Sequence, residues 1–238
     1  MDLKEESILG DTIDNHWYYK NKASAVLYYL HGVYYQKIMD VGAGSGFFTH
    51  YLLTHTDARS GLCVDISYPD DRDVLVAEKP VRYRKSCGEE DVDLVLLMDV
   101  LEHVDDDVGL LQEYIAKVPS GTHFLITVPA FQFLWSSHDV FLEHRRRYTL
   151  GYLDKVTQEA GLKLVYGSYY FGAVFPIAAG IRLGERLLGL STLEPKSGLK
   201  THNPFVNYIL STLCRIERPI MRWNRLAGLS VFCLCRKP

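Results

Sequence analysis

The residues best suited to chemistry lie between Ala130 and Thr149, where the chain reads Ala-Phe-Gln-Phe-Leu-Trp-Ser-Ser-His-Asp-Val-Phe-Leu-Glu-His-Arg-Arg-Arg-Tyr-Thr. Histidine changes charge near neutral pH, so it can accept or release a proton during a reaction, and a neighbouring carboxylate can fix its tautomer. His138, which Asp139 follows directly, is therefore our first candidate for a general base. His144 is the second and His103 the third. A histidine that bonds within the loop or caps a helix accounts for each of them equally well.

The same segment contains groups that could hold an acceptor molecule. The guanidinium groups of Arg145, Arg146 and Arg147 can grip a carboxylate or phosphate through paired hydrogen bonds. They could equally anchor the loop to an acidic part of the protein. Because the segment is also rich in aromatic residues, the substrate-binding candidates are Trp135, Arg145, Arg146 and Tyr148.

Such a segment needs a scaffold, and the strongest signal for one is the stretch 37–48, Lys-Ile-Met-Asp-Val-Gly-Ala-Gly-Ser-Gly-Phe-Phe. It reads as a strand ending in an acid, a turn with alternating glycines and the start of a helix, which together bring backbone close to a ligand. A dinucleotide fingerprint needs a small residue where Phe47 stands, and Asp40 would repel a pyrophosphate. A positively charged ligand reverses that sign, so the turn favours a cationic ligand.

Two further strands follow the glycine turn. Residues 61–65 read as a strand ending in Asp65, which lies 19 residues beyond Gly46, close to the separation at which a carboxylate reaches ribose hydroxyls. This acid does not separate one ribose-containing cofactor from another. The continuous apolar run 92–99 is typical of a strand buried on both faces.

Several of these stretches resemble one family. Asp-Val-Gly-Ala-Gly-Ser-Gly at 40–46 resembles the first motif of class I S-adenosylmethionine (SAM)-dependent methyltransferases. Asp-Leu-Val-Leu-Leu-Met-Asp-Val-Leu-Glu-His-Val at 93–104 is similar to the family's fourth-strand motif, and residues 119–129 to its fifth-strand segment. These motifs cover about residues 35–130 in the expected order. His16-Trp17-Tyr18, the His-Asp pair and the His-x-Arg-Arg-Tyr-Thr run at 144–149 resemble a subgroup of the family.

The resemblance implies SAM as the cofactor and S-adenosylhomocysteine as the product. It implies that the cofactor lies beside the ends of several strands and is covered by an N-terminal helix, with Ser86 and Cys87 near the adenine. The cofactor-binding candidates are Asp40, Gly42, Ala43, Gly44, Gly46, Asp65, Ile66, Ser86, Cys87, Asp99, Val100, His103 and Trp17.

The fold expected from these elements is α/β, a Rossmann-like, doubly wound, seven-stranded and mostly parallel sheet. Residues 1–170 and 229–238 should form the SAM-binding domain, with the last strand, 229–235, antiparallel at the edge of the sheet. Residues 69–80 should hold at most a short helix. Residues 171–228 should be a helical insertion of two helices, the second beginning at the cap signal Asn203-Pro204.

Composition narrows the possible partners. The chain has 238 residues, 47% hydrophobic and 23% charged, enough for a sizeable core. Residues 1–170 carry 16 Lys+Arg against 26 Asp+Glu, whereas residues 171–238 carry 10 against 3, so the tail is basic. An anionic partner such as a membrane surface suits that tail, although tail and body could simply pair with each other. Nucleic acid is not an expected partner, because the body is acidic and no basic stripe alternates with stacking aromatics.

The remaining sequence features concern compartment and metal. Five cysteines without Cys-x-x-Cys spacing, and an N-terminus lacking the features of a signal peptide, suggest free thiols and a cytoplasmic protein, for which residues 171–228 offer a peripheral contact with the membrane. Asp105, Asp106 and Asp107 precede a helix and read as capping residues, so no metal is expected.

Our hypothesis is that the protein is a methyltransferase that acts on an O, N or C atom of a small-molecule or lipid-linked acceptor. Methyl transfer from a sulfonium is an in-line displacement that needs alignment, exclusion of water and a base for some acceptors, but neither a metal nor a covalent intermediate. The alternatives are a SAM-binding protein without catalysis and, less well supported, a nicotinamide-dependent oxidoreductase. An oligomer is possible, with residues 171–228 as a dimer contact, a membrane surface or a roof over the substrate.

Overall fold

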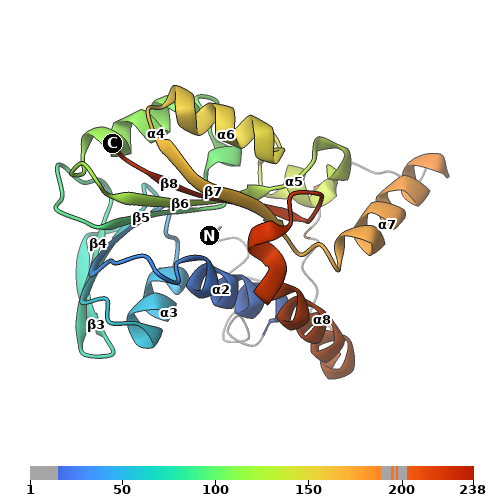
Figure 1. Ribbon diagram of the computed structural model, residues 1–238, viewed down its shortest axis with the longest axis horizontal. Coiled ribbons are helices and arrows are strands. Elements are labelled where there is room, and N and C mark those ends of the chain that lie inside the picture. Colours follow the sequence, from blue (N-terminus) through green and yellow to red (C-terminus); the bar gives the residue numbers. More distant parts are fainter. Residues whose placement is uncertain (1–15, 189–193, 196, 198–202) are drawn as a thin grey trace.

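An eight-stranded sheet forms the centre of the molecule (Figure 1). The computed structural model describes residues 16–188, 194, 195, 197 and 203–238, and the statements below concern these residues. The strand order is β3-β4-β2-β1-β5-β6-β8-β7, in which the five strands from β4 to β6 are mutually parallel. The strands are β1 Lys37–Val41, β2 Ser60–Val64, β3 Arg72–Val76, β4 Lys79–Arg84, β5 Leu94–Met98, β6 His123–Pro129, β7 Lys163–Tyr170 and β8 Ser230–Arg236.

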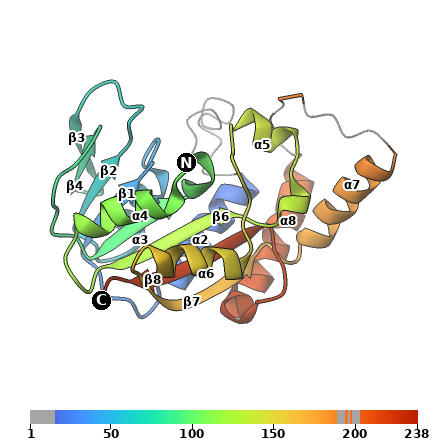
Figure 2. The same cartoon turned by 90° about the horizontal axis from the view of Figure 1, so that it is seen from above.

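Helices cover both faces of this sheet, as Figures 1 and 2 show. On one face lie α2 (Trp17–Tyr29) and α3 (Phe47–His55), and on the other lie α4 (Asp107–Ala116) and α6 (Leu150–Glu159). Each face has its own apolar core, and every residue of β5 is buried between the two. The expected Rossmann-like α/β architecture is therefore confirmed, and it places the ends of the parallel strands along one edge.

Three expectations about the sheet were wrong in detail. The sheet has eight strands rather than seven, because residues 72–76, within the segment expected to hold at most a short helix, form β3 and pair with β4 in an antiparallel hairpin. The last strand, β8, is antiparallel as expected, but it does not lie at the edge. It runs between β6 and β7, so that β7 is the edge strand.

Helix ends follow the polar residues that the sequence offers as caps. The side chain of Asp106 accepts a hydrogen bond from the backbone N–H of Gly109 at the start of α4, and Thr149 accepts one from Tyr152 at the start of α6. These caps were expected and are confirmed.

All five cysteines are free, and all but Cys87 are buried.

Between β7 and β8 the chain forms two helices that project from the sheet, α7 (Phe175–Leu187) and α8 (Pro204–Glu217), followed by the 3-10 helix η4 (Arg218–Trp223). Asn203 caps α8 by accepting from the N–H of Val206, as its position before Pro204 predicts. The buried carboxylate of Glu217 accepts hydrogen bonds from the backbone of Gly172 and Ala173, which fixes the end of α8 to the turn before α7. No helix in the described part of the chain is long and apolar enough to cross a membrane.

Candidate active site

The glycine turn after β1 has a backbone conformation that explains its composition. Gly42, Gly44 and Gly46 have φ values of 63°, 55° and 81°, in the left-handed region that side chains disfavour. The turn is held from outside: Tyr68 donates its hydroxyl proton to the carbonyl of Gly44 at 2.6 Å, and Tyr83 donates to the carbonyl of Ser45 at 2.9 Å. These two hydrogen bonds attach the turn to β4 and to the segment after β2.

Two of these glycines also make room for neighbours. A Cβ on Gly42 would stand 2.8 Å from Cγ2 of Val100, and a Cβ on Gly46 would stand 2.7 Å from the hydroxyl of Tyr83. Val100 follows β5, so this close packing brings the end of β5 against the glycine turn. The candidates Gly42 and Val100 thus lie next to each other, and their contact with a cofactor stays a prediction.

Asp40 lies behind the turn instead of in front of it. Its side chain is 1% exposed and accepts a hydrogen bond from the Thr49 hydroxyl of α3 at 2.9 Å. Burial raises the pKa of Asp40 to about 6. The carboxylate expected to attract a cation is thus present at the turn, but it must lose a proton near pH 6 to carry its charge.

The acid after β2 also supports the turn. The carboxylate of Asp65 accepts hydrogen bonds from the N–H groups of Gly44, at 3.0 Å, and Ser67, at 2.9 Å. Ile66 beside it is 91% exposed. Ser86 is exposed after β4, whereas Cys87 is half-buried and packs towards the core on the α4 side. These candidates line the edge formed by the ends of β4, β2 and β1, and their contacts with a cofactor remain predictions.

An ion pair between a buried lysine and a half-buried aspartate, which the sequence did not reveal, lies at the end of β5. Lys22 of α2 is fully buried and donates to the carboxylate of Asp99 and, at 3.2 Å, to the hydroxyl of Tyr18. Asp99 also accepts from the Thr127 hydroxyl at 3.1 Å. Burial alone would lower the pKa of Lys22, but Asp99 raises it above its usual value, and Lys22 in turn holds the pKa of Asp99 down against the effect of burial. The charge of the candidate Asp99 is therefore already paired with that of Lys22.

Trp17 begins α2 at the side where α8 lies. Its backbone N–H donates to the side chain of Asn207 at 2.9 Å, and its ring packs edge-on against Phe171 at a centroid distance of 5.8 Å. The half-buried ring therefore joins the N-terminal helix to the segment after β7. Its expected contact with the cofactor remains a prediction.

The loop 131–147 that follows β6 is closed at its base. The N–H of Phe131 donates to the carbonyl of Tyr148 at 2.8 Å, and the N–H of Tyr148 donates to Pro129 at 2.9 Å. The 3-10 helix η3 (Gln132–Leu134) and the short helix α5 (Ser137–Phe141) lie within it. Both ends of the loop are thus fixed to β6, at the same edge of the sheet as the glycine turn.

Asp139 is the centre of this loop, but it does not orient His138. Its fully buried carboxylate accepts from His144 Nδ1 at 3.0 Å, from Arg147 Nε at 2.7 Å and from the N–H of Ser136 at 2.8 Å. Although burial would raise the pKa of Asp139, the hydrogen bonds from His144 and Arg147 hold it well below the usual range. The proposed pairing of His138 with Asp139 is therefore wrong, because adjacent residues on α5 point in different directions.

The sequence did contain a signal for this arrangement. Ser136 and Asp139 form a capping box, in which the Ser136 side chain accepts from the helix and Asp139 accepts from the Ser136 backbone. The pattern Ser-x-x-Asp predicts such a box at a helix N-terminus. A capping box directs the Asp139 side chain towards the backbone of Ser136, away from His138. In the structure His144 is the histidine that bonds to Asp139.

Two of the four substrate candidates hold the loop in place instead. Tyr148 is fully buried and donates its hydroxyl proton to Leu101 and Asp107, so its assignment to substrate binding was wrong. The guanidinium of Arg146 is engaged by the side chain of Asp107 and the carbonyls of Val104 and Asp105, which is the anchoring alternative. The two remaining candidates are Arg145, whose side chain is 56% exposed, and the half-buried Trp135.

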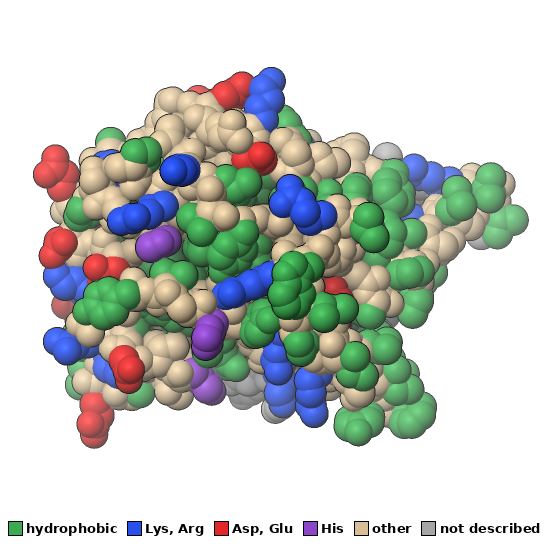
Figure 3. All heavy atoms as spheres, viewed as in Figure 1, with side chains coloured by type: hydrophobic (Ala, Val, Ile, Leu, Met, Phe, Trp, Pro, Cys, Tyr) green, Lys and Arg blue, Asp and Glu red, His purple; other side chains and the backbone are tan. Residues whose placement is uncertain are grey.

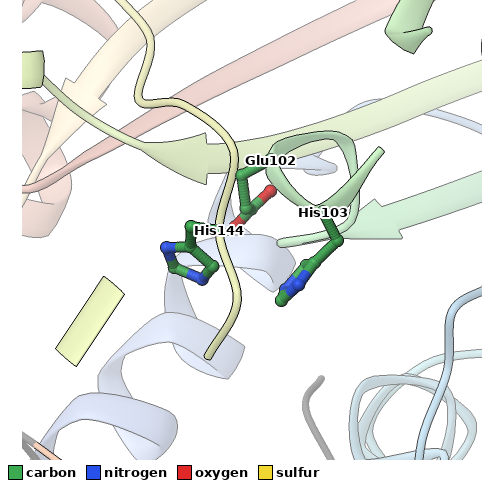
Figure 4. A group of neighbouring side chains, drawn as sticks. All are labelled: Glu102, His103 and His144. Atoms are coloured by element: carbon green, nitrogen blue, oxygen red, sulfur yellow. The ribbon is translucent and has the colours of Figure 1, made fainter. Parts of the chain in front are cut away.

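Three side chains face one another at the end of β5. Figure 4 shows Glu102 and His103, from the 3-10 helix η2 (Leu101–His103), and His144 around a common space. One ligand atom of each lies within 4.8 Å of the others, so the group could hold a divalent cation. Glu102 is completely buried, and among the described residues neither of its carboxylate oxygens has a hydrogen-bond partner. Burial and the negative charge of Asp99 raise the pKa of Glu102 well above its ordinary value, so the neutral acid is favoured.

A family model described as a methyltransferase domain matches residues 15–166. A ubiquinone biosynthesis O-methyltransferase of Paramagnetospirillum magneticum is 33% identical over 135 residues, a match that covers 51% of this chain and 51% of that protein. The chain thus matches about half the length of this curated relative.

Solved structures share the fold. A SAM-dependent methyltransferase from Mesorhizobium loti has a TM-score of 0.52 at 14% identity, over 91% of this chain and 100% of that chain. Phosphoethanolamine N-methyltransferase 2 of Haemonchus contortus, solved with SAM, has a TM-score of 0.57 at 16% identity, over 98% of this chain and 56% of that chain. The [4+2]-cyclase SpnF has a TM-score of 0.52 at 15% identity, over 91% and 82%. At these identities the likeness concerns the fold alone.

Proposed function

We propose, since the chain belongs to the methyltransferase domain family, that it transfers the methyl group of SAM to an O, N or C atom of a small-molecule or lipid-linked acceptor. One observation carries the proposal: the glycine turn and an oriented histidine are linked through residues that directly follow β5. Val100 packs against Gly42, and Glu102 and His103 face His144. A cofactor held at the turn would therefore have a proton acceptor near its reacting end.

The bound cofactor would supply the electrophilic methyl group. The protein then has to align the acceptor, exclude water and remove a proton where the acceptor carries one. His144 is suited to the last task, because Asp139 holds its Nδ1–H and leaves Nε2 as the basic nitrogen. A positioned base of this kind typically contributes a factor of about 10²–10⁴ to the rate.

Cofactor binding is assigned to the turn and its surroundings. Gly42, Gly44 and Gly46 would let backbone approach the amino-acid end of SAM, and the ionised Asp40 would attract its positive charge from behind the turn. Asp65 would exchange its bond to Gly44 for the ribose hydroxyls. The free thiols are consistent with a reducing compartment, so a cytoplasmic location is part of the proposal.

The fold permits a second kind of function, because the cyclase SpnF shares it. The chain could accordingly bind SAM without transferring the methyl group. A nicotinamide oxidoreductase is less compatible with the turn, because the bulky Phe47 occupies the position at which the dinucleotide fingerprint carries a small residue.

Calorimetry with SAM and with NAD tests the cofactor assignment, since the proposal requires SAM to bind and NAD not to compete. Methyl transfer is tested by measuring S-adenosylhomocysteine release across a panel of hydroxyl, amine and carbon acceptors. His144→Asn should lower turnover by about 10²-fold or more with SAM affinity nearly unchanged. His138→Asn, a histidine of the same loop six residues earlier in the chain, is the matched control and should retain turnover.

Two outcomes would contradict the proposal. Binding of SAM with no transfer to any acceptor would favour the non-catalytic alternative. Equal loss of turnover in the His144 and His138 variants would remove His144 from the role of base.

A further inference from the structure

The exposed apolar side chains of this protein are concentrated on one part of its surface. Twelve of the nineteen large hydrophobic side chains that are exposed in the described part of the chain lie between Ile177 and Leu226. In Figure 3, hydrophobic side chains gather over the part of the molecule where α7 and α8 project from the body. Soluble monomers rarely expose so many apolar groups together, so this surface requires a partner.

Helix α7 makes the case most clearly. It buries none of its 13 residues. Ile177, Ile181, Leu183 and Leu187 are 55%, 55%, 60% and 78% exposed. An isolated helix of this length is marginal in water, and the stability of short helices comes from packing an apolar face. The apolar side chains of α7 therefore stabilise the helix only when a partner covers them.

Helix α8 and the 3-10 helix η4 also expose apolar side chains. Phe205, Ile209 and Ile216 are exposed at a spacing of four and then seven residues, which places them on one helical face. Ile220 and Trp223 continue the exposed apolar surface along η4, and Trp223 is 75% exposed. Tryptophan is enriched where a protein meets the boundary between water and lipid.

The charge on these elements selects the partner. Residues 171–228 contain eight Lys+Arg and three Asp+Glu. Glu217, one of these acids, is buried and bonded to backbone, whereas Arg186, Arg215 and Arg225 are exposed. Two copies of the chain packed through this surface would bring these like charges together. An anionic bilayer instead attracts the arginines while its acyl region receives the apolar side chains.

We propose that α7, α8 and η4 form a docking surface for an anionic lipid bilayer, on which the protein lies without crossing the membrane. Neither helix is long enough to span one. The docking surface is continuous with the loop after β6, because Phe175 at the start of α7 packs on Phe131 and Phe133 at centroid distances of 5.5 and 6.1 Å. An acceptor carried in the bilayer would thus reach the loop that contains His144. This last step rests on the proposed methyl transfer.

Vesicle binding tests the docking surface without SAM or an acceptor, so its failure is distinct from failure of the proposed function. The full chain is mixed with vesicles of phosphatidylcholine alone or with 30–40% phosphatidylglycerol, about the anionic content needed for strong attraction, and sedimented. We expect binding only to the anionic vesicles, with weakening at high salt. Ile181→Asp and Leu187→Asp should each lower the partition coefficient at least ~10-fold, because a charge replaces an apolar group that the bilayer would bury. Arg186→Gln and Arg215→Gln should each lower it about fivefold.

Matched controls use exposed residues outside the surface. Leu75→Asp replaces a leucine that is 73% exposed on β3, and Lys155→Gln replaces a lysine whose side chain is 70% exposed on α6. Both variants should bind vesicles like the wild type. A protein that ignores anionic vesicles, or whose binding Leu75→Asp weakens as much as Ile181→Asp, would overturn the proposal. A concentration-dependent dimer that Ile181→Asp dissociates, without vesicle binding, would identify a second copy as the partner instead.

Discussion

The buried carboxyl of Asp40 should make cofactor affinity depend on pH near 6. In the free protein this group is 1% exposed, and burial raises its pKa from 3.8 to about 6. A cationic cofactor at the glycine turn favours the ionised form, so binding should drive the release of a proton. If only the ionised form binds SAM tightly, about one molecule in eleven is competent at pH 5 and about ten in eleven at pH 7. SAM affinity should therefore rise about tenfold over this interval.

Whereas ionisation of Asp40 should strengthen SAM binding as pH rises, the same ionisation should lower the stability of the folded protein. A carboxyl with a raised pKa favours the folded state at low pH, and its contribution is lost as pH rises through the folded-state value of about 6. The shift of about two units corresponds to about 3 kcal/mol at most. Asp40→Asn keeps the size of the side chain without the charge, so it should be more stable than the wild type at pH 8 and bind SAM more weakly.

Calorimetric titration with SAM, in buffers of different ionisation enthalpy, measures both the affinity and the protons released. The wild type should release about 0.9 proton per SAM at pH 5 and about 0.1 at pH 7, and Asp40→Asn should release none at either pH. Urea unfolding of the two proteins at pH 5 and pH 8 gives the stability comparison.

Two results would refute this reasoning. An equal pH dependence of affinity in Asp40→Asn would assign the proton to another group, such as a histidine. A wild-type affinity that does not change between pH 5 and pH 7 would mean that the cofactor does not sense Asp40.

Three further substitutions test the site. Gly46→Ala places a Cβ 2.7 Å from the Tyr83 hydroxyl at φ 81°, so it should weaken SAM binding and lower the free energy of unfolding, measured in urea, by about 1–3 kcal/mol. The control Gly32→Ala has a similar φ of 87° but no atom within 4 Å of the new Cβ, so it should lose less stability and keep its SAM affinity. Equal effects of the two substitutions would exclude the clash with Tyr83. Asp139→Asn turns an amide N–H₂ towards donors and should cost about 3–5 kcal/mol and at least ~10² in turnover, and unchanged turnover would remove Asp139 from catalysis. Because burial raises the pKa of Glu102, its contribution to stability is lost as pH rises; Glu102→Gln should match the wild type near pH 4 and exceed it at pH 8 in urea unfolding, and a pH-independent difference would contradict the neutral acid.

Local patterns predicted the parts of the fold that are determined locally. The strand, glycine turn and helix at 37–48 were recognisable because three glycines stand where φ is positive. The hairpin of β3 and β4 was missed because its turn has positive φ values without the glycines that would have marked them in the sequence. Its turn has positive φ at Ala77 and Glu78, 49° and 62°, where hairpins of this type usually carry Asn-Gly, and β3 is exposed along most of its length. Neither turn residues nor buried alternation marked it.

The site shows the same division. The glycines and acids that follow consecutive strands were predicted as a group, because strand order brings their ends to one edge. The partners of individual charges were not predicted. Lys22 reaches Asp99 across 77 residues of chain, and Arg146 reaches Asp107 across 39. Such pairs depend on how helices and loops pack, which spacing along a sequence does not record.

The position of β8 inside the sheet has a consequence for how the chain folds during synthesis. β7 pairs with β8 alone, so it cannot join the sheet until residues 230–236 have left the ribosome. Until then the edge of β6 is open and α7 and α8 are attached to an unfinished domain. The nascent chain therefore exposes the apolar side chains of α7 and α8 at the moment when a strand edge is also unpaired, a state in which a chaperone or a lipid surface would be most useful. Shortening the chain by one strand would remove two from the sheet.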